Sequence, residues 1–326
     1  ATRALLKGLS NNDSKNIGLP ALVVNTFHLY LQPGYARIKQ AGGVHDFMNI
    51  DIPLVSDSGG FQVFSLIHRG DNMGSINDHG AKFKSPLNGA WHDLDSEKSI
   101  KIQLDLGTDI VVCLDDCPPN DSDDETMNKA IERTVRWAGE CKKVFEAEIK
   151  KRKINKNKKP LLMAVIQGGE KVETRKYCAE ELKKIGFDGY GYGARPVDKD
   201  GNFLEEILQV TADAAPVNTF RFALGIGTPD DIVRCTRMGY DIFDCVIPTR
   251  EGRHGRLFYS IHDNFFTKSG TVAKFYKTIN IANAKFIKDD SPINKNSKLN
   301  ELREYSKSYL HHLFKVKDPL GARLAS

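Results

Sequence analysis

Seven short apolar runs in this sequence end in a small or polar residue that could take part in chemistry. Those residues are Asn25, Asp57, Asp115, Gln167, Gly193, Gly225 and Asp244. If the runs are strands of an α/β barrel, their carboxyl ends meet on the face where such barrels carry their active site. Three carboxylates on one rim are hard to explain as turns or helix caps, because a buried carboxylate must be paired or protonated. The pattern therefore predicts one polar site.

The residue types in this set suit work on a nucleobase attached to a sugar. Two carboxylates can break and remake a glycosidic bond when one attacks the sugar carbon and the other transfers a proton. A third carboxylate can accept hydrogen bonds from the ring N–H and amine of guanine, and a glutamine can donate to its carbonyl. Phe61 and Leu224 could stack on the two faces of the ring, although Phe61 could equally be a core residue. A sugar-chain glycosidase is the weaker alternative.

The runs themselves indicate the fold. They cover residues 21–25, 53–58, 109–115, 161–167, 187–193, 220–227 and 242–248. Most are rich in Val, Ile and Leu with little alternation, as buried parallel strands are, and helical stretches separate them. With one further strand at the start, this pattern predicts an eight-stranded (β/α) TIM-type barrel with insertions and a C-terminal helical extension. An open doubly wound sheet is the structural alternative.

Composition shifts along the chain suggest its organisation. We expect a catalytic barrel domain at residues 1–288 and a helical segment at 289–326, after a polar stretch at 290–297. Residues 68–95 look like a long excursion between barrel units. Ser122 and Glu125 form a capping-box pattern ahead of a long helix. The basic run at 150–159 that follows is either a solvated loop or a phosphate contact.

The bulk composition is that of an ordinary globular protein of 326 residues, 40% hydrophobic and 27% charged. A net charge of +5 permits a polyanionic partner without requiring one. The six cysteines form no Cys-x-x-Cys pair, so spacing indicates neither a zinc site nor a disulfide framework, and a reduced cytoplasmic location is the simplest expectation. No apolar run is long enough to cross a bilayer, so we expect no membrane partner.

Two long motifs resemble the tRNA-guanine transglycosylase family. They are Ser-Asp-Ser-Gly-Gly-Phe-Gln-Val at 56–63 and Phe-Asp-Cys-Val-Ile-Pro-Thr-Arg-Glu-Gly-Arg at 243–253. Shorter stretches at 24–29, 114–117, 166–169 and 187–190 match in family order across nearly the whole chain. The resemblance implies a (β/α) barrel enzyme that exchanges guanine in a tRNA anticodon loop for a 7-deazaguanine base, without a redox cofactor or catalytic metal.

Carried over to the matching positions, the resemblance implies catalytic roles for three residues. Asp244 would attack the ribose and form a covalent aspartyl-ribose intermediate, Asp57 would be the general acid/base, and Asn25 would orient the acids. Arg250 and Arg253 would bind the anticodon loop, although arginines in general are more often plain surface charge. A further set would bind the base, namely Asp115, Gln167, Gly193, Phe61, Leu224 and Ser58.

The sequence departs from the family at its zinc cluster. Family members usually carry a Cys-x-Cys-x-x-Cys cluster and a later histidine, and the matching cysteine positions here are Ser297, Leu299 and Leu302. Two adjacent histidines, His311 and His312, do not make a tetrahedral site without thiolates. We therefore expect no zinc, and expect Leu299 and Leu302 to form an apolar cluster in its place. Homodimer formation, which involves this region in the family, becomes an open question.

The second departure is the loop at 193–199, which reads Gly-Ala-Arg-Pro-Val-Asp-Lys. Arg195 and Lys199 stand where a leucine and a glutamate would recognise an aminomethyl group, and cationic side chains repel a cationic substituent. Asp198 could compensate. A neutral nitrile-bearing base or queuine stays possible as the incoming base. Two other functions also stay open: a non-catalytic RNA-binding accessory subunit, and a paralogue that modifies another nucleic acid.

Overall fold

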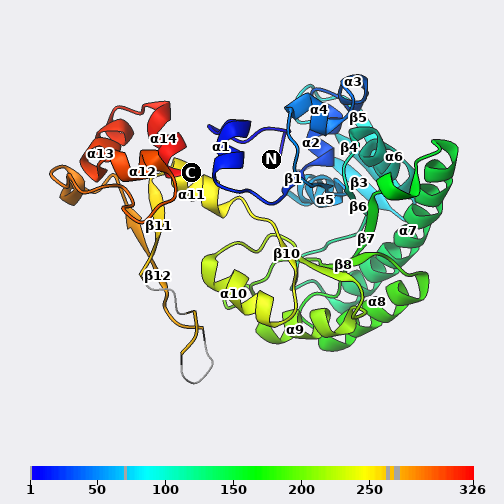
Figure 1. The fold of residues 1–326 in the computed structure, drawn as a ribbon. Helices are drawn as coiled ribbons and strands as arrows, with labels where there is room; N and C mark the ends of the chain where they lie inside the picture. Colours follow the sequence, from blue (N-terminus) through cyan, green and yellow to red (C-terminus); the bar gives the residue numbers. More distant parts are fainter. Residues whose placement is uncertain (1, 70–71, 262–264, 268–271) are drawn as a thin grey trace. The chain divides into compact units, whose positions relative to one another are not determined.

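The structure is a computed structural model that describes residues 2–69, 72–261, 265–267 and 272–326 (Figure 1). Two compact units make up the chain. The first consists of Pro20–Gly225 and Cys235–Asp244 with a short N-terminal stretch, and the second of Leu6–Leu19, Ile226–Arg234 and Cys245–Ser326. The boundary expected between residues 288 and 289 lies inside the second unit, and a domain division at that point stays a prediction.

The first unit is built on a sheet of seven parallel strands. They are β1 (Leu22–Val24), β2 (Leu54–Ser56), β6 (Ile110–Val112), β7 (Leu161–Ile166), β8 (Gly189–Tyr192), β9 (Phe220–Ala223) and β10 (Ile242–Phe243). Each of the seven apolar runs contains one of them. The order of strands across the sheet is the order along the chain. A doubly wound sheet reverses its order at a switch point, so that alternative is wrong for the part of the chain described here.

The α/β class with a curled parallel sheet is confirmed, but the eight-stranded barrel is not. The sheet curls like part of a barrel wall (Figure 1). Among the described residues it holds seven strands, and the further strand expected at the start of the chain is not one of them.

Helices join successive strands of this sheet. Between β1 and β2 lie α2 (Thr26–Leu31), α3 (Tyr35–Gln40) and α4 (Val44–Met48); between β2 and β6 lie α5 (Gly60–Arg69) and α6 (Ser96–Leu106); the later connections carry α7 (Asp124–Lys151) with the short 3-10 helix η1 (Lys156–Lys158), α8 (Val172–Ile185), α9 (Glu205–Ala214) and α10 (Pro229–Arg237). Figure 1 shows α7, α8 and α9 along the outer side of the curled sheet.

The longest helix, α7, begins one residue later than the capping-box pattern suggested. Its N-cap is Asp123, whose side chain accepts a hydrogen bond from the Thr126 backbone N–H at 2.8 Å. Asp and Ser cap helices equally well, so adjacent candidates leave the start uncertain by one residue. Met127, Ile131 and Phe145 are buried along one face, as the helical spacing predicted.

Both faces of the sheet are buried, which explains the missing alternation in the sequence. In β7, Leu162, Ala164 and Ile166 belong to the large apolar cluster that the helices cover. Met163 and Val165 point to the opposite face and join a smaller cluster inside the curl. Strand residues alternate between faces, so a run that is apolar throughout needs an apolar environment on each side.

The excursion expected at residues 68–95 forms a small sheet of its own; residues 70 and 71 lie outside the described residues. Three antiparallel strands, β3 (Gly74–Asn77), β4 (Gly80–Lys84) and β5 (Trp91–Leu94), pair in chain order. Phe83 and Leu94 are buried in the large cluster of the first unit. The insertion is therefore packed onto the helical layer.

The second unit gathers segments that are far apart in the sequence. It contains α1 (Asn11–Asn16), α11 (Ile247–Arg253), β11 (Arg256–Ser260), β12 (Tyr276–Asn280), the 3-10 helix η2 (Ala284–Phe286), α12 (Asn300–Glu304), α13 (Lys307–Lys315) and α14 (Pro319–Ala325). Its apolar cluster includes Leu257, Ile281 and Leu310. Arg323 in α14 binds the carboxylate of Asp13 in α1 at 2.6 Å, and this pairing lowers the pKa of Asp13 to about 2.

None of the described helices combines the length and the apolar character needed to span a membrane.

Candidate active site

A cavity of about 270 Å³ opens at the carboxyl ends of the seven strands, entirely within the first unit. Drug-sized ligands occupy roughly 300–1,000 Å³, so this cavity suits a smaller, flat molecule. The structure brings nine of the expected site residues to its wall, namely Asp57, Ser58, Phe61, Asp115, Gln167, Gly193, Leu224, Gly225 and Asp244. Each comes after a strand of the sheet. Neighbouring parallel strands end on the same side, and this brings these residues together.

Asp57 follows β2, and three groups donate hydrogen bonds to its carboxylate. Its Oδ1 accepts from the backbone N–H of Thr26 at 2.9 Å and of Gly59 at 3.1 Å, and its Oδ2 accepts from the side-chain amide of Asn25. Although the carboxylate borders the cavity, protein surrounds it, and this desolvation raises its pKa to about 7. The hydrogen bonds oppose that rise and the charge of Asp244 adds to it. Both protonation states of Asp57 are therefore populated near neutral pH.

Asn25 does not line the cavity but acts through Asp57. It is the N-cap of α2, with its side-chain oxygen accepting from the His28 backbone N–H at 3.0 Å. The nitrogen of the same amide donates to Asp57. One side chain thus fixes the start of a helix and the orientation of a carboxylate, as the expected orienting role requires.

Asp244 follows β10 and shares the cavity with Asp57. Its Oδ1 accepts from the backbone N–H of Gly225 at 3.0 Å, and burial raises the pKa of its carboxyl group. Gly225 has φ +75°, a left-handed conformation that favours glycine. This turn after β9 therefore aims a backbone donor at the Asp244 carboxylate.

Asp115 and Gln167 form a bonded pair on another part of the wall. The Gln167 Nε2 donates to Asp115 Oδ2 at 2.6 Å, and the Ser58 hydroxyl donates to Asp115 Oδ1 at 3.4 Å. Desolvation raises the pKa of Asp115 to about 6, while the Gln167 hydrogen bond opposes this and the charge of Asp116 adds to it. A carboxylate and an amide at one edge of a flat cavity offer both acceptors and donors to a ligand.

Gly193 makes room for Gln167. A Cβ atom at this position would lie 2.3 Å from Gln167 Nε2 and 2.5 Å from a Val165 methyl group, so a side chain here would displace the amide. The Gly193 backbone N–H donates to the Ile166 carbonyl, and the Gly193 carbonyl accepts from Arg175. Both backbone groups of Gly193 already have hydrogen-bond partners. Its contribution to the cavity is therefore the absence of a side chain, which lets another group come close to the backbone.

Arg175 in α8 is a site residue that the sequence reasoning missed. Its guanidinium is fully buried and donates to the carbonyls of Ile166 at 2.7 Å, Gly193 at 2.8 Å and Gly169 at 3.0 Å. It also lies over the Tyr192 ring, 4.4 Å from the centroid. Arg175 thus ties the ends of β7 and β8 together behind Gln167 and Gly193. An arginine within a helical pattern looks like a surface residue, so no sequence signal marked it.

Apolar side chains line part of the cavity. Phe61 at the start of α5 is 53% exposed and lines the cavity, so it is not a core residue. Leu224 after β9 and the side chains of Val23, Val112 and Val165 line it as well. The valines come from the inward faces of strands, where small branched side chains leave space for a ring. Gln62 and Cys117 are further lining residues that were not expected.

Arg250 and Arg253 belong to the second unit, on the last turn of α11. The Arg250 side chain is half exposed, with its Nε 3.5 Å from a carboxylate oxygen of Glu251. Arg253 is partly exposed. Residues three apart lie on the same helix face, so both cations can serve one ligand. The basic run at 150–159 joins α7 to β7, at the opposite end of the sheet from the cavity, which favours the solvated-loop interpretation.

The loop after β8 borders the cavity with its first residues and is fixed at Arg195 by hydrogen bonds. The Arg195 carbonyl accepts from the Asn120 side-chain amide at 2.9 Å and from the Tyr192 hydroxyl at 3.0 Å. Asp198 accepts from Asp200 and Asn202 within its own turn, and these bonds lower its pKa. Of this loop, Gly193 and Ala194 line the cavity. The carboxylate of Asp198 bonds to groups within its own turn, and Asp198 is not among the residues that line the cavity.

The residues at the family's zinc positions do not fit a zinc ion. The Ser297 hydroxyl accepts from the Leu299 backbone N–H at 3.1 Å, and Leu302 packs against the apolar cluster of the second unit. His311 is buried and its Nδ1 bonds the Ile281 carbonyl, which is a packing role. Across the described ranges no three His, Cys, Asp or Glu side chains gather as metal ligands. A tetrahedral zinc site needs four ligands, usually thiolates or imidazoles.

Comparison with known proteins agrees with this geometry. A family model described as queuine tRNA-ribosyltransferase matches residues 1–326. Proteins named queuine tRNA-ribosyltransferase are similar over the full chain. That of Halothermothrix orenii is 38% identical over 325 residues, covering 100% of this chain and 79% of the relative. That of Aliivibrio fischeri strain MJ11 is 39% identical over 323 residues, covering 99% of this chain and 79% of the relative. This chain therefore belongs to the queuine tRNA-ribosyltransferase family.

Proposed function

We propose that this protein is an active tRNA-guanine transglycosylase, a pentosyltransferase that exchanges guanine in a tRNA anticodon loop for a free 7-deazaguanine base. The observation that carries the proposal is one cavity with two enclosed carboxylates, Asp57 and Asp244, beside the bonded pair Asp115–Gln167. Family membership supports it independently, since the relatives are named for transfer of queuine to tRNA.

In the first step Asp244 is the nucleophile. Its carboxylate oxygen bonds to C1′ of the ribose while the bond from C1′ to the base nitrogen breaks. Protonated Asp57 gives its proton to the departing guanine, and a pKa of about 7 makes that form available near neutral pH. The product is an ester between Asp244 and the ribose, with guanine free in the cavity.

The second step is the reverse with a new base. Asp57, now a carboxylate, takes the N9 proton of the incoming 7-deazaguanine base. That nitrogen bonds to C1′ and the Asp244 carboxylate leaves. Two displacements at one carbon give net retention, by the logic of retaining glycosidases with a base in place of water. No electron transfer and no external oxidant enters either step, so neither step calls for a redox cofactor.

Asp115 and Gln167 are the base-reading pair in this account. The Asp115 carboxylate accepts from the ring N–H and exocyclic amine of guanine, and Gln167 donates to the guanine carbonyl. Ser58 supports the Asp115 carboxylate, while Phe61 and Leu224 cover the two faces of the ring. Gly193 lets the base approach closely. Arg250 and Arg253 bind the phosphates or bases of the anticodon loop.

The incoming base is one without a positive charge on its side group. The cationic side chain of Arg195 follows the cavity-lining Ala194, and Asp198 is engaged in its own turn. A cation on the base would meet Arg195 without a free carboxylate to offset it. A nitrile-bearing or larger neutral base fits this account. An eight-stranded barrel, a cytoplasmic location, the absence of zinc and a homodimer stay predictions from the sequence and the resemblance.

Incorporation of radiolabelled guanine into unmodified tRNA tests the function. We expect label to enter tRNA with the wild-type protein and with the exposed control Asp51→Asn, but not with Asp244→Asn. An accessory RNA-binding subunit would bind tRNA without transferring label in any form of the protein. Label entering a matched DNA stem-loop in preference to tRNA would assign the same chemistry to a paralogue with another substrate.

A further inference from the structure

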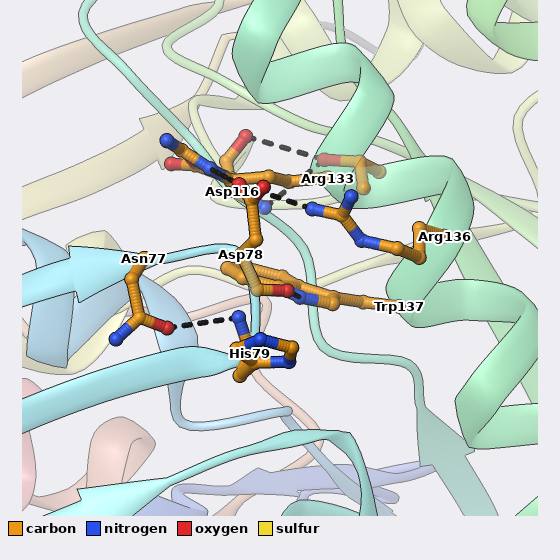
Figure 2. A network of polar contacts seen from close by, with 8 residues as sticks. Asn77, Asp78, His79, Asp116, Arg133, Arg136 and Trp137 are labelled. Carbon is orange, nitrogen blue, oxygen red and sulfur yellow. Dashed lines mark hydrogen bonds and ion pairs between the residues drawn. The ribbon is translucent and has the colours of Figure 1, made fainter.

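Asp116, the neighbour of the base-reading Asp115, is held by α7. Its Oδ2 lies 3.0 Å from Nη1 of Arg133, and Asp116 is only 4% exposed (Figure 2). Its backbone is fixed on the same turn of α7, since the Asp116 N–H donates to the Thr134 hydroxyl at 3.0 Å. One turn of α7 therefore binds both the carboxylate and the backbone N–H of Asp116.

The same arginine also contacts the small inserted sheet. Nε of Arg133 bonds Oδ1 of Asp78, in the turn between β3 and β4, at 3.1 Å. Arg136 binds the same oxygen at 3.2 Å, and the Trp137 indole donates to the Asp78 carbonyl at 2.9 Å. Figure 2 shows Arg133 between Asp78 and Asp116, with Arg136 directed to Asp78. Arg133 thus links the inserted sheet to Asp116, the chain neighbour of the cavity-lining Asp115.

Asp115 and Asp116 place two adjacent carboxylates in one enclosed environment, where like charges oppose each other's ionisation. The charge of Asp116 raises the pKa of Asp115. The guanidinium of Arg133 is an opposite charge in contact with Asp116 and offsets that effect. Because few water molecules reach this region, the interaction is weakly screened.

The other groups around Asp115 add little negative charge. Burial raises the pKa of Cys113, Cys117 and Cys178 above the ordinary value of a thiol, so these side chains stay neutral. Gln167 and Ser58 contact Asp115 as neutral donors. Arg175 contributes a positive charge from α8, bonded to backbone carbonyls. Burial is the largest cause of the raised pKa of Asp115, and Asp116 is the neighbouring anion that raises it further.

We infer that Arg133 is a positioning residue of the base-binding site, which keeps the Asp115 carboxyl ionised by pairing with Asp116. Only an ionised carboxylate has two oxygens free to accept from both donors of the guanine edge, whereas a protonated one carries a donor instead. The consequence for guanine rests on the proposed function. The charge coupling between Arg133 and Asp115 does not depend on it.

The coupling can be read directly from the Asp115 carboxyl. Protein labelled with ¹³C at the aspartate carboxyl carbon is titrated by NMR, with Asp115→Asn used to assign the resonance. We expect Arg133→Ala to raise the pKa of Asp115 by about one unit, the lower end of the range for a nearby charge. Arg133→Lys keeps the charge and should restore much of the wild-type titration. Arg136→Ala is the matched control, because Arg136 contacts Asp78, and it should leave Asp115 unchanged.

A double variant separates charge from structural damage. In Arg133→Ala/Asp116→Asn both partners lose their charge, so the pKa of Asp115 should return to the wild-type value or below it. A purely structural role for Arg133 would instead leave the double variant at least as perturbed as the single one. An Asp115 titration in Arg133→Ala that matches wild type overturns the inference.

Equilibrium dialysis with labelled guanine then connects the coupling to binding. With the pKa of Asp115 at about 6 in wild type and about one unit higher in Arg133→Ala, the ionised fraction at pH 6 falls about fivefold. We expect guanine binding to weaken by that factor at pH 6 and to be close to wild type at pH 8. Equal weakening at both pH values contradicts the coupling. A shifted titration in a protein that binds no guanine in any form would preserve the coupling and refute the proposed function.

Discussion

The side chains of Gln167 and Asp115 are bonded to each other across 2.6 Å, although they follow different strands and lie 52 residues apart. The pair is enclosed, since Gln167 is buried and Asp115 nearly so. Each partner fixes the other before any ligand enters, so little ordering entropy opposes binding of a base. The edge of the cavity that we propose binds the base is thus preorganised.

Gln167→Ala is expected to weaken guanine binding by about tenfold to one-hundredfold, the range for losing a hydrogen bond to a charged group and one to the ligand. It removes a donor that lowers the pKa of Asp115, so the loss should be larger at pH 6 than at pH 8. Isothermal titration with guanine measures both effects. Gln209→Ala, on the exposed face of α9, is the control. Binding unchanged in Gln167→Ala would remove this residue from base recognition.

Asn25→Ala is expected to move the pH dependence of base exchange. The Asn25 amide hydrogen bond lowers the pKa of Asp57, which stands at about 7. Without that bond the ionised form of Asp57 is less stable, so its pKa rises. The acidic limb, where activity rises as Asp57 ionises, should then shift to higher pH. It is measured as kcat/KM for labelled guanine across pH 5.5 to 9.

The control for this variant must keep the helix cap intact. Asn25→Asp retains the oxygen that accepts from His28 but replaces the amide donor with a further carboxylate. It should raise the pKa of Asp57 more than Asn25→Ala does. A profile that stays in place in both variants would show that Asp57 does not set the pH dependence.

Arg250→Ala and Arg253→Ala are expected to weaken tRNA binding while leaving free guanine binding within twofold of wild type. Each variant removes one cation from the last turn of α11. If that cation contacts a phosphate, the slope of log affinity against log salt should fall by about one. Filter binding over a salt series measures it, and Lys317→Ala in the same unit is the control. A slope equal to wild type in both variants would refute the RNA contact.

The second unit is expected to be stable without a metal. Treatment with EDTA should leave the thermal midpoint of the wild-type protein unchanged, because apolar packing holds the segment around Leu302. Leu302→Ser, which removes a partly buried leucine from that packing, should lower the free energy of unfolding by about 1–2 kcal/mol. Val316→Ser, at an exposed position, should not. A midpoint that falls with EDTA and returns with Zn²⁺ would contradict this.

The seven strands and the polar residues at their ends could be read from the sequence for a physical reason. Strands such as β7 are buried on both faces, so Leu162 through Ile166 are apolar throughout and stand out from amphipathic helices. Gln167 is visible because it interrupts that apolar pattern just as the strand ends. The positions of the cavity-lining residues at the strand ends follow from the strand order.

Other features leave no local pattern. Arg175 and Arg133 sit in helices where an arginine is usually solvated, and only the carbonyls or carboxylate of distant segments make them part of the site. Asp13 and Arg323 are 310 residues apart, so no window of sequence shows that α1 belongs to the second unit. Strands β3 to β5 are short and rich in glycine and polar residues. Their sequence therefore resembles that of a loop, and the strands could not be predicted from it.

Trapping of a covalent protein–RNA adduct tests the central claim, that Asp244 is the nucleophile. Wild-type protein and Asp51→Asn are incubated with unmodified tRNA, quenched in denaturant, and resolved on a denaturing gel. The account predicts an adduct with both, mapped by mass spectrometry to the peptide that contains Asp244, and no adduct with Asp244→Asn. An adduct that persists in Asp244→Asn, or that maps to Asp57, would contradict the account.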